Sequence, residues 1–508
     1  MFQWLADLND SVNTFVWITI GVWLLVGSGV IMTVLTGFFQ VSHFGHWIKK
    51  TIGSVFKKRV IAHTGEKGTI SQFQALCTAL SATVGTGNIA GVAAAITMGG
   101  PGAIFWMWVA AFFGMMTNYS ENVLGIFFRR RNSKGEWSGG AMYYLRDGLG
   151  AKKGMKTVGA VLAILFSCFA VLASFGIGNI SQVNTIVLNI ESSFAIPSLS
   201  SIVLYNNVNL YKIIIAAVVL ILSALVIVGG LKRIASVAEK IVPFMIICFL
   251  IGAIVVIIKN VGNLGVAFAA IFRSAFSAKA AWGAVTGLTI KTMVVWGFKR
   301  GCFSNEAGLG SSVMVHSNSN VKEPVHQGLW GIFEVFVDTI VICTLVALVI
   351  LTSGVIDLET GAIVQGGGEG ATLVATAFST VFGSFGAKFV AVALFLFAFT
   401  TVLGWSHYGT KSIEYLGGEK AASVYKVIFV VIIITGSLLT SSLAWDISDT
   451  FNGLMMIPNL IGVLVLSPIV VRLTRNYVRR EIHSEKIEPM LSAFPDIQAE
   501  QAARTDED

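Results

Sequence analysis

Long apolar stretches recur along the whole chain, separated by short polar segments. About eleven of them approach the roughly 20 residues that a helix needs to cross a bilayer. They fall at 14–38, 70–97, 102–128, 157–191, 211–229, 237–258, 283–313, 327–352, 386–413, 421–441 and 447–471. The stretch at 157–191 is too long for one upright crossing and predicts a strongly tilted helix. The pattern predicts an all-α polytopic membrane protein of about 11 transmembrane helices.

Two of these stretches are interrupted by glycine-rich, polar sequence. The first interruption is SATVGTGNIAG at 81–91, and the second is WGFKRG at 296–301, which runs on into SNEAGLG at 304–310. Lipid cannot satisfy the backbone of a broken helix, so such backbone persists only where protein, water or a solute completes it. Interrupted spans in corresponding positions of two halves are typical of the central site of a secondary transporter.

The order of the stretches predicts two related halves. The divisions are an N-terminal span with a basic loop (1–69), a first five-helix repeat (70–258), an external connecting segment (259–282), a second five-helix repeat (283–472) and a tail (473–508). Because five is odd, the second group enters the membrane from the opposite side, which makes the repeat inverted. Amphipathic segments at 265–281 and 372–385 are expected on the outer surface. The charged tail predicts a short helix followed by disorder.

Composition and charge agree with a membrane protein and exclude a nucleic-acid-binding one. Of the 508 residues, 55% are hydrophobic and only 12% charged, too few charges for the surface of a soluble protein of this size. The net charge of +8 comes from lysines and arginines in alternate loops, at 49–67, 129–156, 232–240, 411–420 and 472–480. This bias predicts a multi-pass protein of the plasma (inner) membrane with its N-terminus outside and its C-terminus in the cytoplasm. We expect the lipid bilayer as a partner, no nucleic acid and no obligatory protein partner.

The first interruption offers groups suited to a zwitterion and a cation. The amides of Thr86, Gly87 and Asn88 open the second half-helix, whose N-terminus carries partial positive charge suited to a carboxylate. Carbonyls that end the first half-helix, from Ser81 to Val84, suit a cation. The alternative is that these small residues only let helices pack closely.

The second interruption predicts part of the wall of the same site. Trp296, Gly297 and Phe298 are expected to line it and to supply carbonyls. Beside them, Lys299 and Arg300 need partners, because unpaired basic groups are costly at membrane depth.

Buried acids are the natural partners of these two basic residues. Glu121 in the third span and Glu306 just beyond the interruption are the candidates, and we expect the network to be structural or a gate. Asp338 and Glu334, one turn apart in the eighth span, form an acid pair. They could pair with the basic residues, bind a proton or organise the gate, and the sequence leaves these roles open.

Several of these strings resemble the alanine/glycine:cation symporter family. They are GTGNIAG at 85–91, GGPGA at 99–103, KRG at 299–301 with NEAGLGSS at 305–312, and VDT at 337–339. The resemblance spans nearly the whole chain and implies a leucine-transporter-type fold and sodium-coupled uptake of small neutral amino acids. Cys302 departs from the family pattern, where a larger apolar residue is expected, and this puts only local packing in doubt.

The resemblance also implies a sodium site. In the leucine-transporter fold, an adjacent hydroxyl pair in the span that holds Thr400 and Thr401 joins carbonyls of the first interruption around one ion. The Ser81 and Val84 carbonyls would complete that cage of oxygens. The alternative is that both threonines hydrogen-bond within their own helix.

Three further roles follow from the resemblance and from spacing. The resemblance places Gln182 facing the substrate and Glu121 where a glutamate ties the two interruptions together. Trp405 lies one turn beyond Thr401 on the same helix face, which suggests a lid that limits side-chain size. Interhelical hydrogen bonding for Gln182 and simple packing for Trp405 are the alternatives.

Together these features predict a sodium-coupled symporter that imports alanine or glycine by alternating access. No cofactor is expected apart from sodium as the coupling ion. A proton-coupled amino-acid symporter is the alternative, and an ion channel is the alternative from another class. An enzyme is not expected, because the chain has neither a His-Glu-x-x-His motif nor an evident pair of catalytic aspartates.

Overall fold

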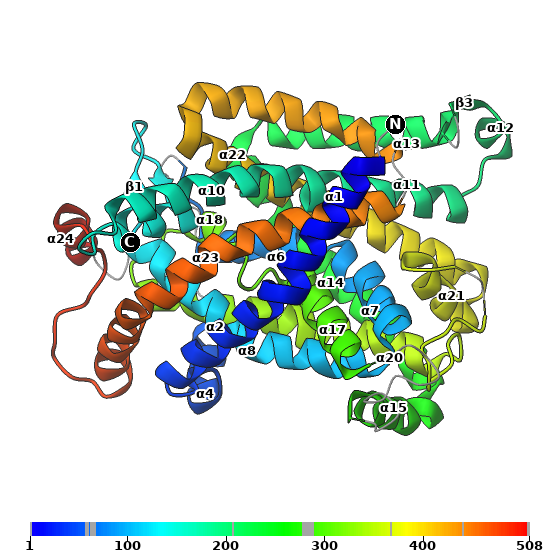
Figure 1. Ribbon diagram of the computed structural model, residues 1–508, viewed down its shortest axis with the longest axis horizontal. Coiled ribbons are helices and arrows are strands. Elements are labelled where there is room, and N and C mark those ends of the chain that lie inside the picture. The colour runs from blue at the N-terminus through cyan, green and yellow to red at the C-terminus, as the bar shows by residue number, and fades with distance from the viewer. Residues whose placement is uncertain are drawn as a thin grey trace.

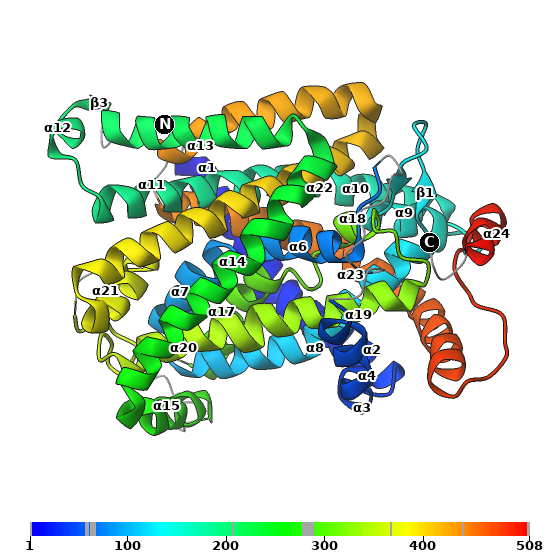
Figure 2. The same cartoon turned by 180° about the vertical axis from the view of Figure 1, so that it is seen from behind.

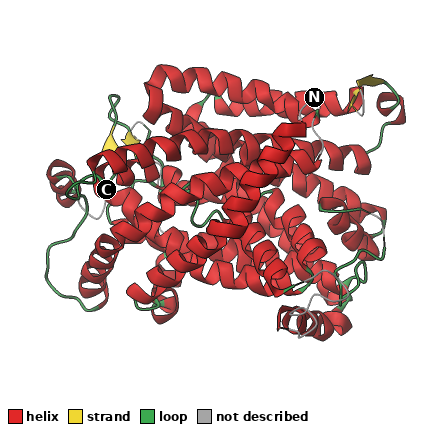
Figure 3. Cartoon of the chain, viewed as in Figure 1, coloured by secondary structure: helices red, strands yellow, loops and turns green. Residues whose placement is uncertain are grey.

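The structure is a computed structural model that describes residues 3–504 apart from 56–59, 61–67, 206–207, 277–288, 366–367 and 439–440. Parts of the predicted basic loop in 1–69, of the connecting segment 259–282 and of the span 283–313 therefore lie outside the described residues. Nearly all of the described chain is helical, and two short hairpins lie in connecting loops (Figure 3). They pair β1 (Arg130–Arg131) with β2 (Trp137–Ser138) and β3 (Val203–Tyr205) with β4 (Val208–Asn209).

The N-terminal part and the first predicted repeat form helices up to Lys259. The N-terminal helices are α1 (Gln3–Thr14), η1 (Phe15–Gly21), α2 (Val22–Leu35), α3 (Phe39–Ser42), α4 (Phe44–Lys50) and η2 (Ile52–Ser54). They are followed by α6 (Gln72–Thr83), η3 (Gly87–Gly91), α7 (Val92–Gly99), α8 (Gly102–Phe127), α9 (Ala141–Tyr143) and η4 (Tyr144–Leu149). The remainder are α10 (Lys156–Phe175), η5 (Gly176–Ile180), α11 (Ser181–Ser193), α12 (Pro197–Ser200), α13 (Leu210–Ile227) and α14 (Gly230–Lys259).

The second predicted repeat and the tail are helical as well. The helices are η6 (Val261–Asn263), α15 (Leu264–Phe276), α17 (Ile290–Asn305), α18 (Val313–His316), α19 (Pro324–Val335), η7 (Phe336–Cys343) and α20 (Thr344–Thr352). They continue with α21 (Ala371–Phe382), α22 (Ser384–Ile432), η8 (Ile433–Ser437), α23 (Ser441–Tyr477), η9 (Val478–Ile482) and α24 (Pro495–Ala503). Within α22 the chain reverses at Gly418, whose φ of 74° is left-handed, so this helix contains two of the predicted spans.

The prediction of a multi-pass membrane protein is confirmed. Within the described residues, 7 helical segments are long and apolar enough to cross a membrane, or 8 if α6 and η3–α7 count as one bent span. The predicted amphipathic segments are present as the separate helices α15 and α21. The count of eleven spans and the inversion of the repeat stay predictions.

The connecting elements gather at two opposite ends of the helix bundle (Figures 1 and 2). One end, called the basic end here, holds β1 with its two arginines, the reversal of α22 at Gly418, and α24. The opposite end holds β3, α12, α15 and α21. The C-terminus lies at the basic end, as expected if the lysine- and arginine-rich loops share one side of a membrane.

Polar side chains mark the inner helices of the bundle. From Met115 to Phe127 every residue of α8 is buried, although this stretch contains Asn118, Glu121 and Asn122. A helix that is enclosed on all sides carries polar groups at a cost unless neighbouring helices complete them. The helices that pack around α8 must therefore supply hydrogen-bond partners for these three side chains.

The tail folds back onto the basic end, so the prediction of disorder is wrong for residues 483–504. The amide of Ala493 donates to the Phe127 carbonyl at the end of α8 (2.9 Å), and Leu491 is buried. Arg131 pairs with Glu500 (2.5 Å) and Arg480 with Glu323 (2.7 Å). Composition suggested disorder because the tail has few apolar residues, but its charges find partners on loops that lie far away in the sequence.

Candidate functional site

The first predicted interruption is a true break, as its glycines suggested. Helix α6 ends at Thr83, Val84 leaves the helix with φ −78° and ψ 86°, and the next turn begins at Gly87. The two half-helices are bent by 50°. The Gly85 amide donates to Asn88 Oδ1 (2.9 Å), so a side chain replaces one of the lost helical partners. We call residues 84–87 the first break.

The second break lies further along the chain than predicted. Helix α17 is continuous through Trp296–Gly301 and ends at Asn305, so the prediction that 296–301 unwinds is wrong. The helix ends because Glu306 (φ 56°), Gly308 (φ 92°) and Gly310 (φ 70°) adopt left-handed conformations. We call residues 306–312 the second break.

The shift of the second break changes what the predicted wall residues do. The carbonyls of Trp296, Gly297 and Phe298 lie within a continuous helix, so they are not the free carbonyl source that was predicted. A Cβ added to Gly297 would lie 2.6 Å from the Ala103 carbonyl oxygen, which shows that this glycine serves close packing on α8. Phe298 lies beside Leu25 of α2 instead of at the first break.

The first break meets the end of α17, just before the second break, in the buried interior of the protein. A Cβ added to Gly87 would lie 3.1 Å from Ser304 Cα, so the backbones on both sides come into direct contact. Asp338 of η7 joins them, because it accepts hydrogen bonds from Asn88 Nδ2 (2.6 Å) and from Ser304 Oγ (2.7 Å). The predicted partner in the acid pair, Glu334, lies instead against His316 Nε2 (3.1 Å).

One of the two predicted hydroxyl ligands reaches the first break. The Thr401 hydroxyl of α22 lies 3.0 Å from the Ser81 carbonyl oxygen at the end of α6 and also 3.0 Å from the Phe397 carbonyl oxygen of its own helix, so it can donate to either. The hydroxyl of Thr400 donates to the Leu396 carbonyl of its own helix (3.0 Å) and lies 3.7 Å from Met245 Sδ of α14. The structure therefore brings Thr401 and Ser81 together, near the end of the helix at Val84, and turns Thr400 away.

Gln182 lies at the first break, and its predicted role of facing the substrate stays a prediction. Its Oε1 accepts a hydrogen bond from the Thr86 amide (3.2 Å), and its Nε2 donates to the Ile177 carbonyl (2.9 Å). The Thr86 hydroxyl is buried and has no hydrogen-bond partner among the described residues. The sequence suggested the amides of Thr86, Gly87 and Asn88 as donors to a carboxylate. Because the Thr86 amide donates to Gln182, only the amides of Gly87 and Asn88 remain candidates for this role.

Trp405 lies between η5 (Gly176–Ile180) and the second break. Its indole Nε1 donates to Glu306 Oε1 (2.7 Å). On its other side a Cβ added to Gly178 would overlap the Trp405 side chain. Sequence reasoning missed Gly178, although the Gly-x-Gly at 176–178 inside a predicted span is a signal of close approach. Trp405 is completely buried, and its ring is fixed at both edges.

The two basic residues at the end of α17 pair with an acid that was not predicted. Arg300 donates to Asp449 of α23 through both terminal nitrogens (3.2 and 3.1 Å), and Lys299 Nζ lies 2.8 Å from the same carboxylate. The predicted partners Glu121 and Glu306 are wrong, because α17 stays helical and directs these side chains toward α23. An acid inside the span 447–471 was the signal that could have identified Asp449.

Glu121, which was predicted to connect the two interruptions, contacts the second break only through Asn459 of α23 among the described residues. Asn459 Nδ2 of α23 donates both to Glu121 Oε1 and to the Gly308 carbonyl in the second break (2.8 Å). Tyr144 donates to Asn459 Oδ1. Glu121 is thereby connected to the second break, whereas no contact connects it to Lys299 or Arg300 among the described residues.

Lys299, Arg300 and Asp449 form a buried group that we call the ion-pair cluster. The N-terminal helix, which consists of α1, η1 and α2 and lies outside both predicted repeats, contacts this cluster. Asn13 Oδ1 accepts from Lys299 Nζ (3.1 Å), and Trp17 Nε1 donates to the Asp449 carbonyl (2.8 Å). The aromatic ring of Trp445 lies 4.9 Å from the Arg300 guanidinium. The cluster therefore closes the region between α1–η1, α17 and α23.

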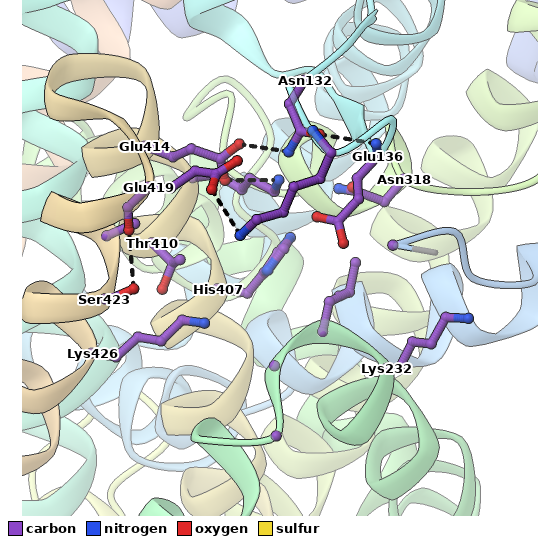
Figure 4. Close-up of a pocket in the computed structure, with 17 residues that line it drawn as sticks. Asn132, Glu136, Lys232, Asn318, His407, Thr410, Glu414, Glu419, Ser423 and Lys426 are labelled. Atoms are coloured by element: carbon purple, nitrogen blue, oxygen red, sulfur yellow. Dashed lines mark hydrogen bonds and ion pairs between the residues drawn. The ribbon is translucent and has the colours of Figure 1, made fainter. Parts of the chain in front are cut away.

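A cavity of about 390 Å³ opens at the basic end (Figure 4). His407, Thr410 and Lys426 of α22 line one side of it, and Asn132 and Glu136 line another. Its wall carries both signs of charge. Outside the membrane-spanning helices, the hydrogen bond that Lys134 donates to Glu419 raises the pKa of Lys134 and keeps this lysine charged. Along α22, Thr401, Trp405 and His407 lead from the first break toward this cavity.

Known proteins resemble the chain over nearly its full length. Residues 2–491 match the sodium:alanine symporter family. The sodium/alanine symporter AgcS of Methanococcus maripaludis is 41% identical over 480 residues, 93% of this chain and 97% of that protein. The amino-acid carrier protein AlsT of Bacillus subtilis is 33% identical over 497 residues, 97% of this chain and 96% of that protein.

A solved structure supports the fold. The crystal structure of MhsT in complex with L-phenylalanine matches with a TM-score of 0.54, over 81% of this chain and 99% of that chain, at 13% sequence identity. At this identity the likeness concerns the fold alone. The predicted leucine-transporter-type fold is confirmed.

Proposed function

Because the chain belongs to the sodium:alanine symporter family, we propose that it imports a small neutral amino acid, alanine or glycine, together with sodium. That the chain is a membrane transporter follows from the family, and its relatives are carriers and not enzymes. The observation that carries the finer proposal is the contact between the first break and the end of α17, where Asp338 joins Asn88, just after the first break, to Ser304, just before the second. Unwound backbone at this depth persists where protein, water or a solute completes it, and in secondary transporters it forms the substrate and ion sites.

Sodium is proposed to bind between α6 and α22. The carbonyls at the end of a broken half-helix point a partial negative charge at a cation. The Ser81 carbonyl and the Thr401 hydroxyl already lie 3.0 Å apart, and a sodium ion held by both oxygens would replace their hydrogen bond. Val84, where α6 ends, remains a predicted ligand, whereas Thr400 would have to change rotamer to contribute.

The amino acid is proposed to bind beside this ion. Its carboxylate would take the amides of Gly87 and Asn88 at the start of the second half-helix, where the helix dipole favours negative charge. Gln182 orders the first break from the other side. No acid lies within the first break itself, and the nearby Asp338 carboxylate is already bonded to Asn88 and Ser304, so we propose a neutral zwitterion rather than a cationic amine as the substrate.

Alternating access is supported by the protein being closed on one side of the proposed site and open on the other. On one side the cluster of Lys299, Arg300 and Asp449 closes the bundle, and on the other the cavity beside His407 is open. With the basic end in the cytoplasm, as the positive-inside bias indicates, the cavity faces inward. We therefore place the protein in the plasma membrane with its N-terminus outside and its C-terminus inside.

An imposed sodium gradient tests the proposal directly. Purified protein in proteoliposomes is expected to accumulate radiolabelled alanine when sodium is added outside, and to stop when choline replaces sodium at constant pH. Each sodium that crosses down 100 mV supplies about 2.3 kcal/mol before its concentration gradient is counted. Unlabelled glycine and alanine should compete with the label, and larger amino acids should compete weakly.

Proton coupling is the second candidate, and one observation favours it. Asp338 is a completely buried carboxylate that contacts residues beside both breaks, and its hydrogen-bond partners Asn88, Ser304 and Thr339 are neutral. A buried carboxyl group in this position could carry a proton in place of a counter-ion. Uptake that persists in choline and follows an imposed pH gradient would establish this mechanism instead.

Replacing Trp405 with alanine is expected to broaden substrate choice. The indole fills the space between Gly178 and Glu306, and removing it frees room for larger side chains. Competition by valine and leucine should strengthen about tenfold or more relative to alanine, since each methylene accommodated is worth about 1–3 kcal/mol. Trp405→Phe, which keeps most of the bulk, should retain the narrow profile. An unchanged profile in Trp405→Ala would show that the tryptophan only packs.

A further inference from the structure

Asn452 of α23 is a buried polar residue for which the structure provides no partner. Its side chain is 0% exposed, and neither Oδ1 nor Nδ2 has a hydrogen-bond partner among the described residues. Leaving even one polar atom buried without a partner costs about 1–3 kcal/mol. An asparagine that leaves both atoms unsatisfied is therefore unusual, and one explanation is a bound solute that completes them.

The neighbours of Asn452 on α23 show which way this amide faces. One turn earlier Asp449 pairs with Arg300 at the end of α17, and two turns later Asn459 binds the Gly308 carbonyl. At 100° per residue, Asn452 lies between these two directions on the same helix face. It is therefore level with residues 301–307, between the ion-pair cluster and the second break.

The adjoining faces of α23 are already filled. A Cβ on Gly176 of η5 would lie 3.1 Å from Ser448 Cα, and Gly453 faces Val16 and Trp17 of the N-terminal helix. The position of Asn452 on α23 therefore faces the angle between η5 and the second break. Trp405 bridges the same two elements, because it contacts Gly178 and Glu306.

Asn459 provides an internal comparison. It is also completely buried on α23, but its Nδ2 donates to Glu121 and Gly308 and its Oδ1 accepts from Tyr144. A structural asparagine in this helix is therefore fully satisfied by protein groups. Asn452 differs from it in having both a donor and an acceptor free.

We propose that Asn452 hydrogen-bonds the transported amino acid and is a substrate-binding residue. One amide presents an N–H for a carboxylate and a carbonyl for an ammonium, which matches the two charged groups of a zwitterion. This inference rests on the proposed function and extends it, because it adds a contact from α23 to those from the two breaks and from α22.

The test is Asn452→Leu, which is close in volume and removes both polar atoms. If the amide binds substrate, the KM for alanine uptake should rise about tenfold or more, as for loss of a hydrogen bond to a charged group. The melting temperature of the purified protein should stay the same or rise, since no protein hydrogen bond is lost. Asn452→Ala serves the same purpose without added bulk if the leucine variant is not recovered from membranes.

Asn184→Leu is the matched control. Its Nδ2 donates to the Gly436 carbonyl (3.0 Å), so this variant should melt at a lower temperature with little change in KM. A wild-type KM in both Asn452 variants would overturn the inference while leaving the proposed function intact. Wild-type protein that neither binds nor takes up alanine, glycine or other neutral amino acids in sodium would contradict the proposed function, and this inference with it.

Discussion

Asp449→Asn is expected to reduce sodium-driven alanine uptake by roughly 100- to 1,000-fold. The carboxylate is completely buried and is shared by Arg300 and Lys299 at 3.1 and 2.8 Å. Removing one partner of a buried ion pair costs about 3–5 kcal/mol, because the remaining charges are left without compensation. Every 1.4 kcal/mol corresponds to a factor of ten in an equilibrium constant.

This loss should appear in transport and not in substrate binding. The ion-pair cluster closes the bundle on the side away from the cavity, so neutralising Asp449 destabilises the closed arrangement on that side. Binding of labelled alanine to detergent-solubilised protein in saturating sodium should therefore be retained, while net uptake into proteoliposomes is lost.

Asp446 supplies the control for this experiment. It lies one turn earlier on α23 and is exposed, and its carboxylate interacts with Lys299 and Arg300 only at longer range, without a salt bridge among the described residues. Asp446→Asn introduces the same chemical change and should transport close to the wild-type rate. Equal activity of the Asp449 and Asp446 variants would show that the buried cluster does not govern closure.

Thr401→Ala is expected to raise the sodium concentration for half-maximal uptake by roughly 10- to 100-fold. The estimate takes the loss of one oxygen from a cation as comparable to the loss of a hydrogen bond to a charged group, about 1.5–3 kcal/mol. The Thr401 hydroxyl is the side chain that reaches the Ser81 carbonyl from α22. At saturating sodium the KM for alanine should return toward the wild-type value.

The neighbouring threonine makes the experiment discriminating. Thr400→Ala removes the same atoms from a side chain that faces Met245 of α14, whereas Thr401, which also bonds within its own helix, faces Ser81 of α6. If the observed geometry persists when sodium binds, this variant should keep its sodium dependence, and Thr401→Ser should restore that of the wild type. Unchanged sodium dependence in Thr401→Ala would move the ion site away from α22.

Sequence reasoning located the first break correctly because its cause is local. Four of the eleven residues at 81–91 are glycine or asparagine (Gly85, Gly87, Asn88 and Gly91), and the chain does unwind there. The same reasoning misplaced the second break. Gly297 and Gly301 suggested unwinding, but these glycines let α17 pack on α8, and the helix ends where Glu306 and the following glycines turn left-handed.

The partners of buried charges were harder to predict, because they depend on contacts between distant segments. Arg300 and Asp449 are 149 residues apart, and nothing in either local sequence specifies the other. Because Lys299 and Arg300 lie within a predicted span, they were expected to need an acidic partner. Several acids in other spans could fill that role, and the sequence alone did not select among them. Asn452 escaped notice for the same reason, since only the packing around it shows that its amide has no protein partner.

The N-terminal helix makes the ion-pair cluster sensitive to the surrounding lipid. Its Phe15 and Trp23 side chains are 52% and 71% exposed within an apolar candidate membrane span, so we expect them to face lipid. Asn13 and Trp17 of the same helix hold Lys299 and the backbone of Asp449. A bilayer thinner or thicker than this helix shifts its tilt at a cost of fractions of a kcal/mol per Å. The free energy of separating Arg300 from Asp449 therefore includes a share set by hydrophobic mismatch, which lets membrane thickness adjust the rate of the transport cycle.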